Sequence, residues 1–456
     1  MTIVNVALPS IQRDLGFSQS GLAWVINAYL IAFGGLLLLA GRIGDLVGRK
    51  RVFLAGLVIF TCASVACGLS FTQPMLIVAR FVQGVGGAVS SAVILAMIVT
   101  LFPEPGDRAK AFGVFSFIAS AGAAVGLIAG GLITQAVSWH WIFFVNLPLG
   151  VVTTVIAYRL LASDRGIGIG KGADVAGAVM VTGALMLGVY TIVQTSDYGL
   201  GSLRTIGLGA LSLAMLAAFV LRQARARNPI LPLRVFRSRM LAGTNLVQAL
   251  MSVPFISFFF LGSLYLERVL NYGPMGIGLA FLPVAVVMGL FSVRFSAPLI
   301  ARFGAGPMLA AGQVMAAAAL VMVAGGPTHA TYAVNFLAPM VLFGLGGRLS
   351  FPALTMLAMS GVAPSDAGLA SGLLNTTGQV GGAFGLAVMA TVAGGRTVQM
   401  MQGGAGLADA LAGGYHLAWL AGAGIVVVTL GLSAWFLRAK PVPQADMKGV
   451  ECEAAA

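Results

Sequence analysis

Long apolar runs separated by short polar segments make up most of the chain. Each run is about 20 residues long, enough to cross roughly 30 Å of hydrocarbon as an α-helix. Thirteen runs are centred near residues 31, 61, 88, 122, 151, 185, 213, 252, 286, 316, 341, 381 and 425. The opening segment MTIVNVALPSI is apolar for only about half the length of a span. We therefore expect fourteen spans, the first of which begins upstream of Met1.

The composition supports a membrane protein with many spans. Of the 456 residues, 59% are hydrophobic and 9% are charged, and the mean hydropathy is +0.98, which excludes a soluble chain. The net charge of +13 would suit nucleic-acid binding. However, the cations are dispersed in short loops between apolar runs, so membrane topology explains them better and no nucleic-acid partner is expected. Cys62 and Cys67 lie in one apolar run and Cys452 in the tail, so no disulfide framework is implied.

One short loop sets the orientation of every span. Residues 41–51 read GRIGDLVGRKR and place four cationic side chains between two membrane-length runs. Lys and Arg near span ends are retained in the cytoplasm, so the loop is predicted to lie there. With sides alternating from this loop, nineteen of the 26 Lys and Arg fall on the cytoplasmic side and four fall outside. The positive-inside rule is then satisfied along the whole chain.

The chain repeats itself with an offset of 256 to 260 residues. GRIGDLVGRKRVFLAGL at 41 is similar to APLIARFGAGPMLAAGQ at 297, and GVGGAVSSAVILAM at 84 is similar to GLGGRLSFPALTMLAM at 344. Such pairs in one order predict two like-oriented halves, a plan that recurs in transporters. We expect a six-helix bundle in residues 1–162, a linker with two extra spans in 163–239, a second six-helix bundle in 240–437 and a cytoplasmic tail in 438–456.

Four segments of the chain resemble signatures of one family. GRIGDLVGRKR resembles a loop signature between second and third spans, RFVQGVGG at 80 a fourth-span signature, TIVNVALPSI the end of a first-span signature, and SWHWIFFVNLPLG at 138 the start of a sixth span. In this order they resemble the major facilitator superfamily, specifically its fourteen-span drug:proton antiporter branch (EmrB/QacA-like). The resemblance covers essentially the whole chain. It implies a major-facilitator fold and proton-coupled transport by alternating access.

Three positions depart from the pattern of that branch. The Asp of the first-span signature would lie just upstream of Met1, so the coupling carboxylate is expected there. Leu127 replaces the Pro of the fifth-span antiporter signature, which supports a uniporter or symporter for a small metabolite as the alternative. Gly378 replaces the usual Arg of the eleventh core span.

The loop residues are expected to form a gate. The resemblance implies that Asp45 and Arg49 pair across the cytoplasmic ends of helices, latch the outward-facing state and separate on inward opening. A carboxylate near a helix N-terminus is also favoured by the helix dipole. The alternative is that the cations only anchor the topology. The gating set is Gly41, Asp45, Gly48, Arg49 and Lys50.

A second polar set lies inside the fourth apolar run. A cation such as Arg80 costs about 3 kcal/mol or more there unless it is paired or hydrated, so a functional role is the default. The resemblance places Arg80, Gln83 and Gly84 in a proton-coupling network that shifts the protonation of the first-span acid. The alternative is a structural contact of Arg80 with backbone carbonyls.

Further polar residues in or near spans are candidates for a substrate cavity. Glu267 would bind a cationic substrate or a proton unless the adjacent Arg268 neutralises it. Arg348 would either attract an anionic or polar substrate or anchor the interface between halves. The candidate cavity residues are Asn5, Glu267, Arg348, Asn375 and Gln379.

Glycines at intervals of four mark one face of the fifth span. Small residues let transmembrane helices approach closely. Gly122, Gly126 and Gly130 are therefore expected to form a hinge where the two halves rock against each other.

The sequence carries no signature of an enzyme. His140, His329 and His416 are scattered without metal-ligand spacing, so no metal site is expected. No Ser, His and acid cluster and no GxxxxGK[ST] phosphate loop is present, so no cofactor is expected and a proton gradient must drive transport. A receptor or channel would not need the paired halves. The sequence thus predicts a monomeric exporter of amphiphilic drugs or antibiotics in the lipid bilayer of a bacterial plasma membrane.

Overall fold

The computed structural model describes residues 2–102, 104–162, 164, 166, 168, 172–199, 201–327, 331–360, 362 and 367–436. Within this part of the chain every regular element is a helix. The elements are α1 (Thr2–Leu15), α2 (Gln19–Leu22), α3 (Trp24–Val47), α4 (Arg49–Gly68), α5 (Gln73–Leu101), α6 (Pro105–Ala136), α7 (Trp141–Phe144), α8 (Asn146–Leu160), α9 (Val175–Tyr198), α10 (Leu203–Arg225), η2 (Leu233–Arg237), α11 (Arg239–Arg268), α12 (Pro274–Arg294), α13 (Ser296–Phe303), α14 (Ala305–Ala324), η3 (Tyr332–Leu337), α15 (Ala338–Ser360), α16 (Ala367–Gln402) and α17 (Leu407–Phe436).

The helices confirm the predicted all-α membrane protein. Twelve helical stretches among the described residues are long and apolar enough to cross a membrane. A helix also covers each of the thirteen centres predicted from the apolar runs. Of the long apolar segments predicted from the sequence, those in α1 and α6 lie outside the twelve: α1 has 14 residues, and α6 contributes the shorter apolar helix Ala124–Ala136.

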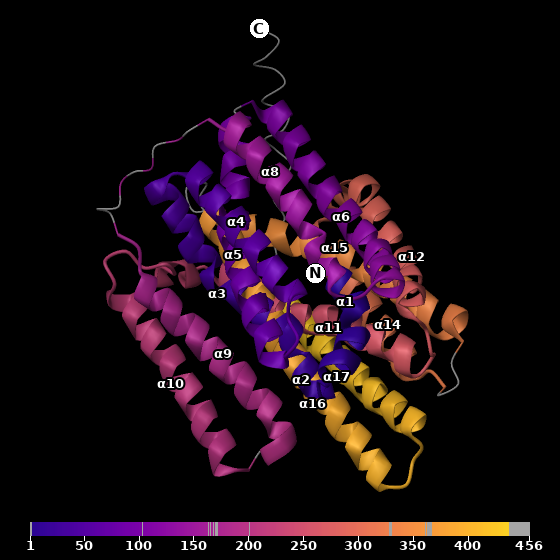
Figure 1. The fold of residues 1–456 in the computed structure, drawn as a ribbon. Helices are drawn as coiled ribbons and strands as arrows, with labels where there is room; N and C mark the ends of the chain where they lie inside the picture. Colours follow the sequence, from indigo (N-terminus) through magenta and orange to yellow (C-terminus); the bar gives the residue numbers. More distant parts are fainter. Residues whose placement is uncertain are drawn as a thin grey trace.

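The helices form two bundles with a helical hairpin beside them (Figure 1). In the first bundle α4 packs on α5 and α8, and α1 packs on α6. In the second bundle α14 packs on α15 and α17, and α11 packs on α16. The bundles meet where α3 contacts α16, α6 contacts α12 and α1 contacts α11. The hairpin of α9 and α10 lies next to α3, and its α9 contacts both α3 and α16, so it touches both bundles.

The sharp turn between α3 and α4 recurs between α13 and α14. Gly48 has φ of 112° and Gly304 has φ of 86°, in the left-handed region that residues with a Cβ rarely adopt. These two glycines are paired by the sequence repeat. Each turn lies on the side predicted to face the cytoplasm, which we call the inner side.

A close crossing of two helices also recurs in both bundles. A Cβ on Gly86 of α5 would lie 3.0 Å from the Gly56 carbonyl oxygen of α4. In the second bundle a Cβ on Gly346 of α15 would lie 2.6 Å from the Gly312 carbonyl oxygen of α14. Glycine permits this approach because it has no side chain. The repeat in the sequence therefore corresponds to a repeat of helix packing.

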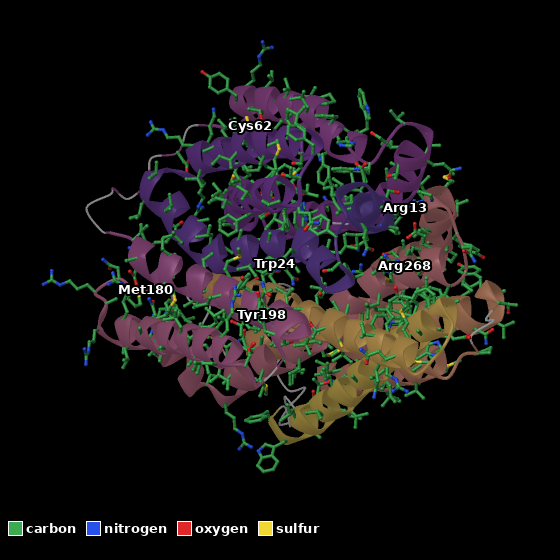
Figure 2. All side chains as sticks on the ribbon, turned by 60° about the horizontal axis from the view of Figure 1, so that its bottom comes forward. Arg13, Trp24, Cys62, Met180, Tyr198 and Arg268 are labelled. Atoms are coloured by element: carbon green, nitrogen blue, oxygen red, sulfur yellow. The ribbon has the colours of Figure 1, made fainter. Side chains whose placement is uncertain are left out.

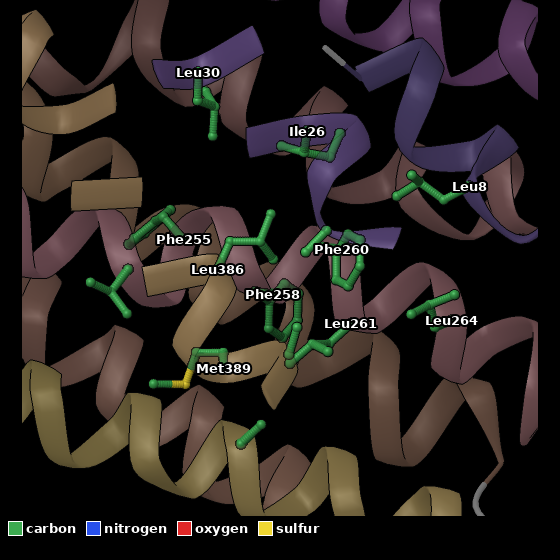
Figure 3. Close-up of a cluster of buried hydrophobic side chains, with 14 of the residues drawn as sticks. Leu8, Ile26, Leu30, Phe255, Phe258, Phe260, Leu261, Leu264, Leu386 and Met389 are labelled. Atoms are coloured by element: carbon green, nitrogen blue, oxygen red, sulfur yellow. The ribbon is translucent and has the colours of Figure 1, made fainter. Parts of the chain in front are cut away.

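Buried apolar side chains from both bundles form one continuous cluster (Figure 3). Leu8 of α1 and Ile26 of α3 belong to it together with Phe258 of α11 and Leu386 of α16. The ring of Phe258 is fully buried and stacks on Phe343 with 4.4 Å between centroids. The bundles are thus packed against each other along α1, α3, α11 and α16.

Candidate gating and coupling sites

The predicted gating loop forms the inner turn between α3 and α4. Arg49 Nη2 lies 3.2 Å from Asp45 Oδ1, so the expected ion pair exists and joins the end of α3 to the start of α4. Gly41 lies on the last turns of α3, and Gly48 provides the turn itself. Both members of the pair belong to the first bundle. Their role in gating stays a prediction.

Asp164, which lies in no motif of the sequence, anchors this turn. Its carboxylate accepts hydrogen bonds from the backbone N–H groups of Arg49, at 2.6 Å, and Lys50, at 3.0 Å. The Lys50 ammonium also donates to the Tyr158 carbonyl oxygen at 2.9 Å. Burial alone would raise the pKa of Asp164, but the N–H groups at the start of α4 outweigh it and hold the pKa below its usual value. The gating turn is thus tied to the segment that follows α8.

Arg80 of α5 is almost fully buried, with 2% of its surface exposed. Its Nε donates to the Val25 carbonyl oxygen of α3 at 2.8 Å, and its Nη1 donates to Gln83 Oε1. The guanidinium carbon lies 4.6 Å from the centre of the Tyr29 ring, in cation–π geometry. Arg80 therefore joins α5 to α3 inside the membrane.

Gln83 extends this contact to two more helices. Its Nε2 donates to Ser64 Oγ of α4 at 2.9 Å, and Asn146 Nδ2 of α8 donates to the same oxygen at 2.9 Å. Gly84 packs against the Tyr29 backbone, where no side chain would fit. The structure thus brings the predicted coupling residues together in one buried polar network. Ser64 and Asn146 were missed because single polar residues in apolar runs give no signal of pairing.

The outer ends of α1 and α11 are joined by two polar contacts. Arg13 Nη2 lies 3.2 Å from Glu267 Oε1, and Arg268 Nη2 donates to Gln12 Oε1. Figure 2 shows Arg13 and Arg268 on the same side of the molecule. We call Gln12, Arg13, Glu267 and Arg268 the outer latch. It connects the first bundle to the second, so these outer ends cannot separate without breaking it.

A second contact between the bundles lies at the outer ends of α6 and α12. Gln135 Oε1 accepts a hydrogen bond from the Met275 backbone N–H at 3.1 Å. A Cβ on Gly131 would lie 2.7 Å from the Pro274 carbonyl oxygen, and one on Gly278 would lie 2.5 Å from the Leu127 carbonyl oxygen. The bundles are therefore in backbone contact on this side.

The five candidate cavity residues do not form one cluster of contacts in the described residues. Glu267 belongs to the outer latch, and Asn5 and Arg348 are half-buried in α1 and α15. Asn375 of α16 is exposed, and Gln379 packs against Gly34 of α3 at the interface between bundles. Their part in substrate binding stays a prediction.

The predicted hinge glycines face different neighbours. Gly130 packs on α1, since a Cβ there would lie 2.9 Å from the Ile3 carbonyl oxygen, whereas a Cβ on Gly122 would meet no atom within 4 Å. Gly126 is half-buried. Gly131, the next residue along, makes the contact with α12. The hinge role stays a prediction, and the sequence missed Gly131 and Gly278 at this interface.

The inner ends of α9 and α10 are joined by Asp174, which the sequence also did not single out. Its carboxylate accepts from Arg222 Nε at 2.7 Å, Gln223 Nε2 at 2.7 Å and the Gly177 N–H at 2.9 Å. Gln223 in turn accepts from the Leu231 N–H at 3.1 Å. Burial would raise the pKa of Asp174, but these donors hold it below its usual value.

Two repeated helical bundles with buried polar networks and a latch between them define a membrane transport protein rather than an enzyme. The model of the Major Facilitator Superfamily matches residues 1–386, and the chain belongs to this family. It is a multi-pass protein of a bacterial cytoplasmic membrane.

Relatives match over most of the chain. The chain is 37% identical over 455 residues to the puromycin resistance protein pur8 of Streptomyces alboniger, covering 98% of this chain and 90% of the relative. It is 38% identical over 398 residues to the cephamycin export protein CmcT of Amycolatopsis lactamdurans, covering 87% and 82%. Among solved structures, the POT family transporter PepTSo has the same fold, with a TM-score of 0.70, 16% identity and coverage of 96% and 94%.

Proposed function

We propose that the protein exports amphiphilic, antibiotic-like small molecules across the cytoplasmic membrane in exchange for protons, by alternating access. The observation that carries the proposal is the similarity, over nearly the whole chain, to proteins named for puromycin resistance and cephamycin export. The α9–α10 hairpin, which follows the first bundle and precedes the second in the chain, supports assignment to the fourteen-span antiporter branch. The same elements support a division into residues 1–162, 163–239 and 240–437, whereas the expected cytoplasmic tail, 438–456, lies outside the described residues.

Alternating access is supported by the outer latch. Two polar contacts hold the outer ends of α1 and α11 together, and α6 and α12 meet at their outer ends. A substrate that leaves on that side requires these contacts to break. Asp45 and Arg49 are proposed to act on the inner side, where their ion pair and Asp164 fix the turn before α4.

Proton coupling is supported by the Arg80 network. A buried guanidinium favours the ionised form of any acid close to it and so sets when that acid gains a proton. The Val25 carbonyl of α3 and the Gln83 side chain of α5 both accept from Arg80, so its charge has a fixed position. A proton acceptor that enters this network would be sensitive to that charge.

The test uses inside-out membrane vesicles with an acidified interior and puromycin as the probe. An antiporter accumulates puromycin and releases protons from the interior, which a trapped pH indicator reports. Arg80→Ala is expected to abolish both signals, and Arg80→Lys, which keeps the charge, to retain part of them. Puromycin uptake that persists after a protonophore would instead indicate a uniporter and end the antiport proposal. Absence of uptake with puromycin and with a β-lactam panel would end the assignment as a drug exporter.

A further inference from the structure

An apolar cavity of about 320 Å³ lies where the α9–α10 hairpin meets the two bundles. Its wall is built by α3, α9, α10, α11, α16 and the chain that follows α10. An apolar cavity of about 150 Å³ stays dry and binds benzene, so this one has room for a longer hydrocarbon group. Representative lining side chains are Leu38, Leu185, Phe219, Leu231, Val380 and Phe384.

The cavity lies toward the inner side of the membrane. Its α9 residues, Val181 and Leu185, lie in the first half of that helix, and Phe219 lies near the end of α10 at Arg225. These are the ends that the positive-inside rule assigns to the cytoplasm. Ile230, Leu231 and Phe236 cover the cavity from the segment that joins α10 to α11. The depth is therefore that of the inner lipid leaflet.

The covering segment is strongly basic. Residues 222–239 contain six arginines and no Asp or Glu. Arg222 is paired with Asp174 at 2.7 Å. The side chains of Arg225, Arg227 and Arg234 are exposed, and Arg227 and Arg234 lie within three residues of Ile230 and Phe236, which line the cavity. An apolar cavity is thus adjacent to a cationic surface.

One polar atom in the cavity wall also lacks a hydrogen-bond partner among the described residues. The Thr376 side chain lines the cavity, and its hydroxyl is buried without a hydrogen-bond partner among the described residues. Its neighbour Thr377 differs, since it donates to Asn245 Oδ1 at 2.9 Å. A buried hydroxyl without a partner is unfavourable, and a carbonyl oxygen of a bound molecule would accept a hydrogen bond from it.

We propose that this cavity and residues 222–239 bind one anionic phospholipid of the inner leaflet. An acyl chain fills the apolar cavity, because burial of each methylene group is favourable. The phosphate group lies on the arginines of the covering segment, as at other basic sites on the cytoplasmic side of membrane proteins. An ester carbonyl at the junction of chain and head group accepts from Thr376.

The position of the site gives the lipid an influence on transport. The cavity wall includes Gly34 and Leu38 of α3 in the first bundle and Val380 and Phe384 of α16 in the second. A lipid that contacts both bundles binds more tightly to the conformation in which α3 and α16 lie closer together. Binding and bundle motion are then linked, and each changes the equilibrium of the other.

Lipid retention is tested with the full chain in nanodiscs of equal parts phosphatidylglycerol and phosphatidylcholine, followed by native mass spectrometry. The wild-type chain is expected to retain one phosphatidylglycerol in preference to phosphatidylcholine. Arg227→Gln with Arg234→Gln should weaken this preference by roughly 30-fold, because each cation near the surface contributes about fivefold. Arg227→Lys with Arg234→Lys should keep the preference for phosphatidylglycerol. Arg204→Gln, at the outer end of α10, is the matched control and should leave the preference for phosphatidylglycerol unchanged.

The cavity itself is tested by Val181→Phe, which adds a ring from the α9 wall. Retention of both lipids is expected to fall roughly tenfold, as displacement of one or two methylene groups predicts. If this variant does not fold, phosphatidylglycerols with progressively shorter acyl chains are tested on the wild type and should bind progressively less well. Equal retention of both lipids by the wild type would overturn the head-group contact. Retention unaffected by Val181→Phe, or by chain length, would overturn the acyl site. None of these readouts depends on transport, so failure here is separate from failure of the export proposal.

Discussion

The outer latch makes a quantitative prediction about the two bundles. Arg13 pairs with Glu267, and Arg268 donates to Gln12, so four residues of α1 and α11 hold the outer ends together. Removing either contact should shift the population toward states that are open on the outer side. The two contacts differ in exposure, so the shifts should differ in size.

The ion pair is the weaker contact. The Arg13 side chain is 69% exposed and that of Glu267 is 18% exposed. Pairs with such an exposed partner contribute about 0.2–1 kcal/mol, so Glu267→Gln should change the open population by at most about fivefold. Arg268→Ala removes a charged donor to a buried amide, worth about 1.5–3 kcal/mol, or roughly 10- to 100-fold. High salt should weaken the first contact more than the second.

Asp14→Asn is the matched control for these variants. Asp14 lies next to the latch and accepts from Trp139 Nε1 at 2.8 Å, but both residues belong to the first bundle. The substitution changes the charge at the outer surface without removing a contact between bundles. It should leave the bundle equilibrium unchanged.

The equilibrium is measured by electron–electron double resonance between spin labels at Val137→Cys and Leu407→Cys, in a chain whose native cysteines have been replaced. Both positions are exposed, with 65% and 61% of their surface accessible, and lie at the outer ends of opposite bundles. A longer-distance population should grow in the order Asp14→Asn, Glu267→Gln, Arg268→Ala. An Arg268→Ala distribution equal to that of Asp14→Asn would refute the latch.

Three further predictions concern folding and stability, two in the first bundle and one in the α9–α10 hairpin. Arg80→Ala should also lower the free energy of unfolding by about 2 kcal/mol, because Gln83 loses a buried partner, and an unchanged denaturation curve in detergent would contradict this. Asp174→Asn should lower the melting temperature by roughly 3 °C through the weakened contact with Arg222. Since the pKa of Asp174 is below its unfolded value of about 4, the wild type keeps this stabilisation at neutral pH and loses it as the pH falls through the folded pKa. The Asn variant should not show that loss, and parallel pH curves would disprove the assignment. Gly86→Leu should prevent folding by separating α4 from α5, as measured by the yield of monodisperse protein, and a normal yield would exclude a close crossing.

The sequence alone determined the class of fold. Its apolar runs fixed where the helices lie, because only a helix satisfies its backbone hydrogen bonds within a single chain segment in lipid. The repeat paired Gly48 with Gly304 and Gly56 with Gly312, and both pairs have matching positions in the structure. Arg80 and Gln83 were also found, because a cation in an apolar span needs a partner.

Only the tertiary structure decided which residues meet across the bundles. The sequence predicts Glu267 as a candidate substrate ligand, and the structure pairs it with Arg13; Asp164 contacts Arg49 from 115 residues away. Neighbouring glycines such as Gly130 and Gly131 face different helices, α1 and α12, because successive residues point about 100° apart around a helix. Hydropathy gives the length of a helix but not its rotation about its axis. That rotation is set by packing against neighbouring helices, and it determines which polar groups come within reach of each other.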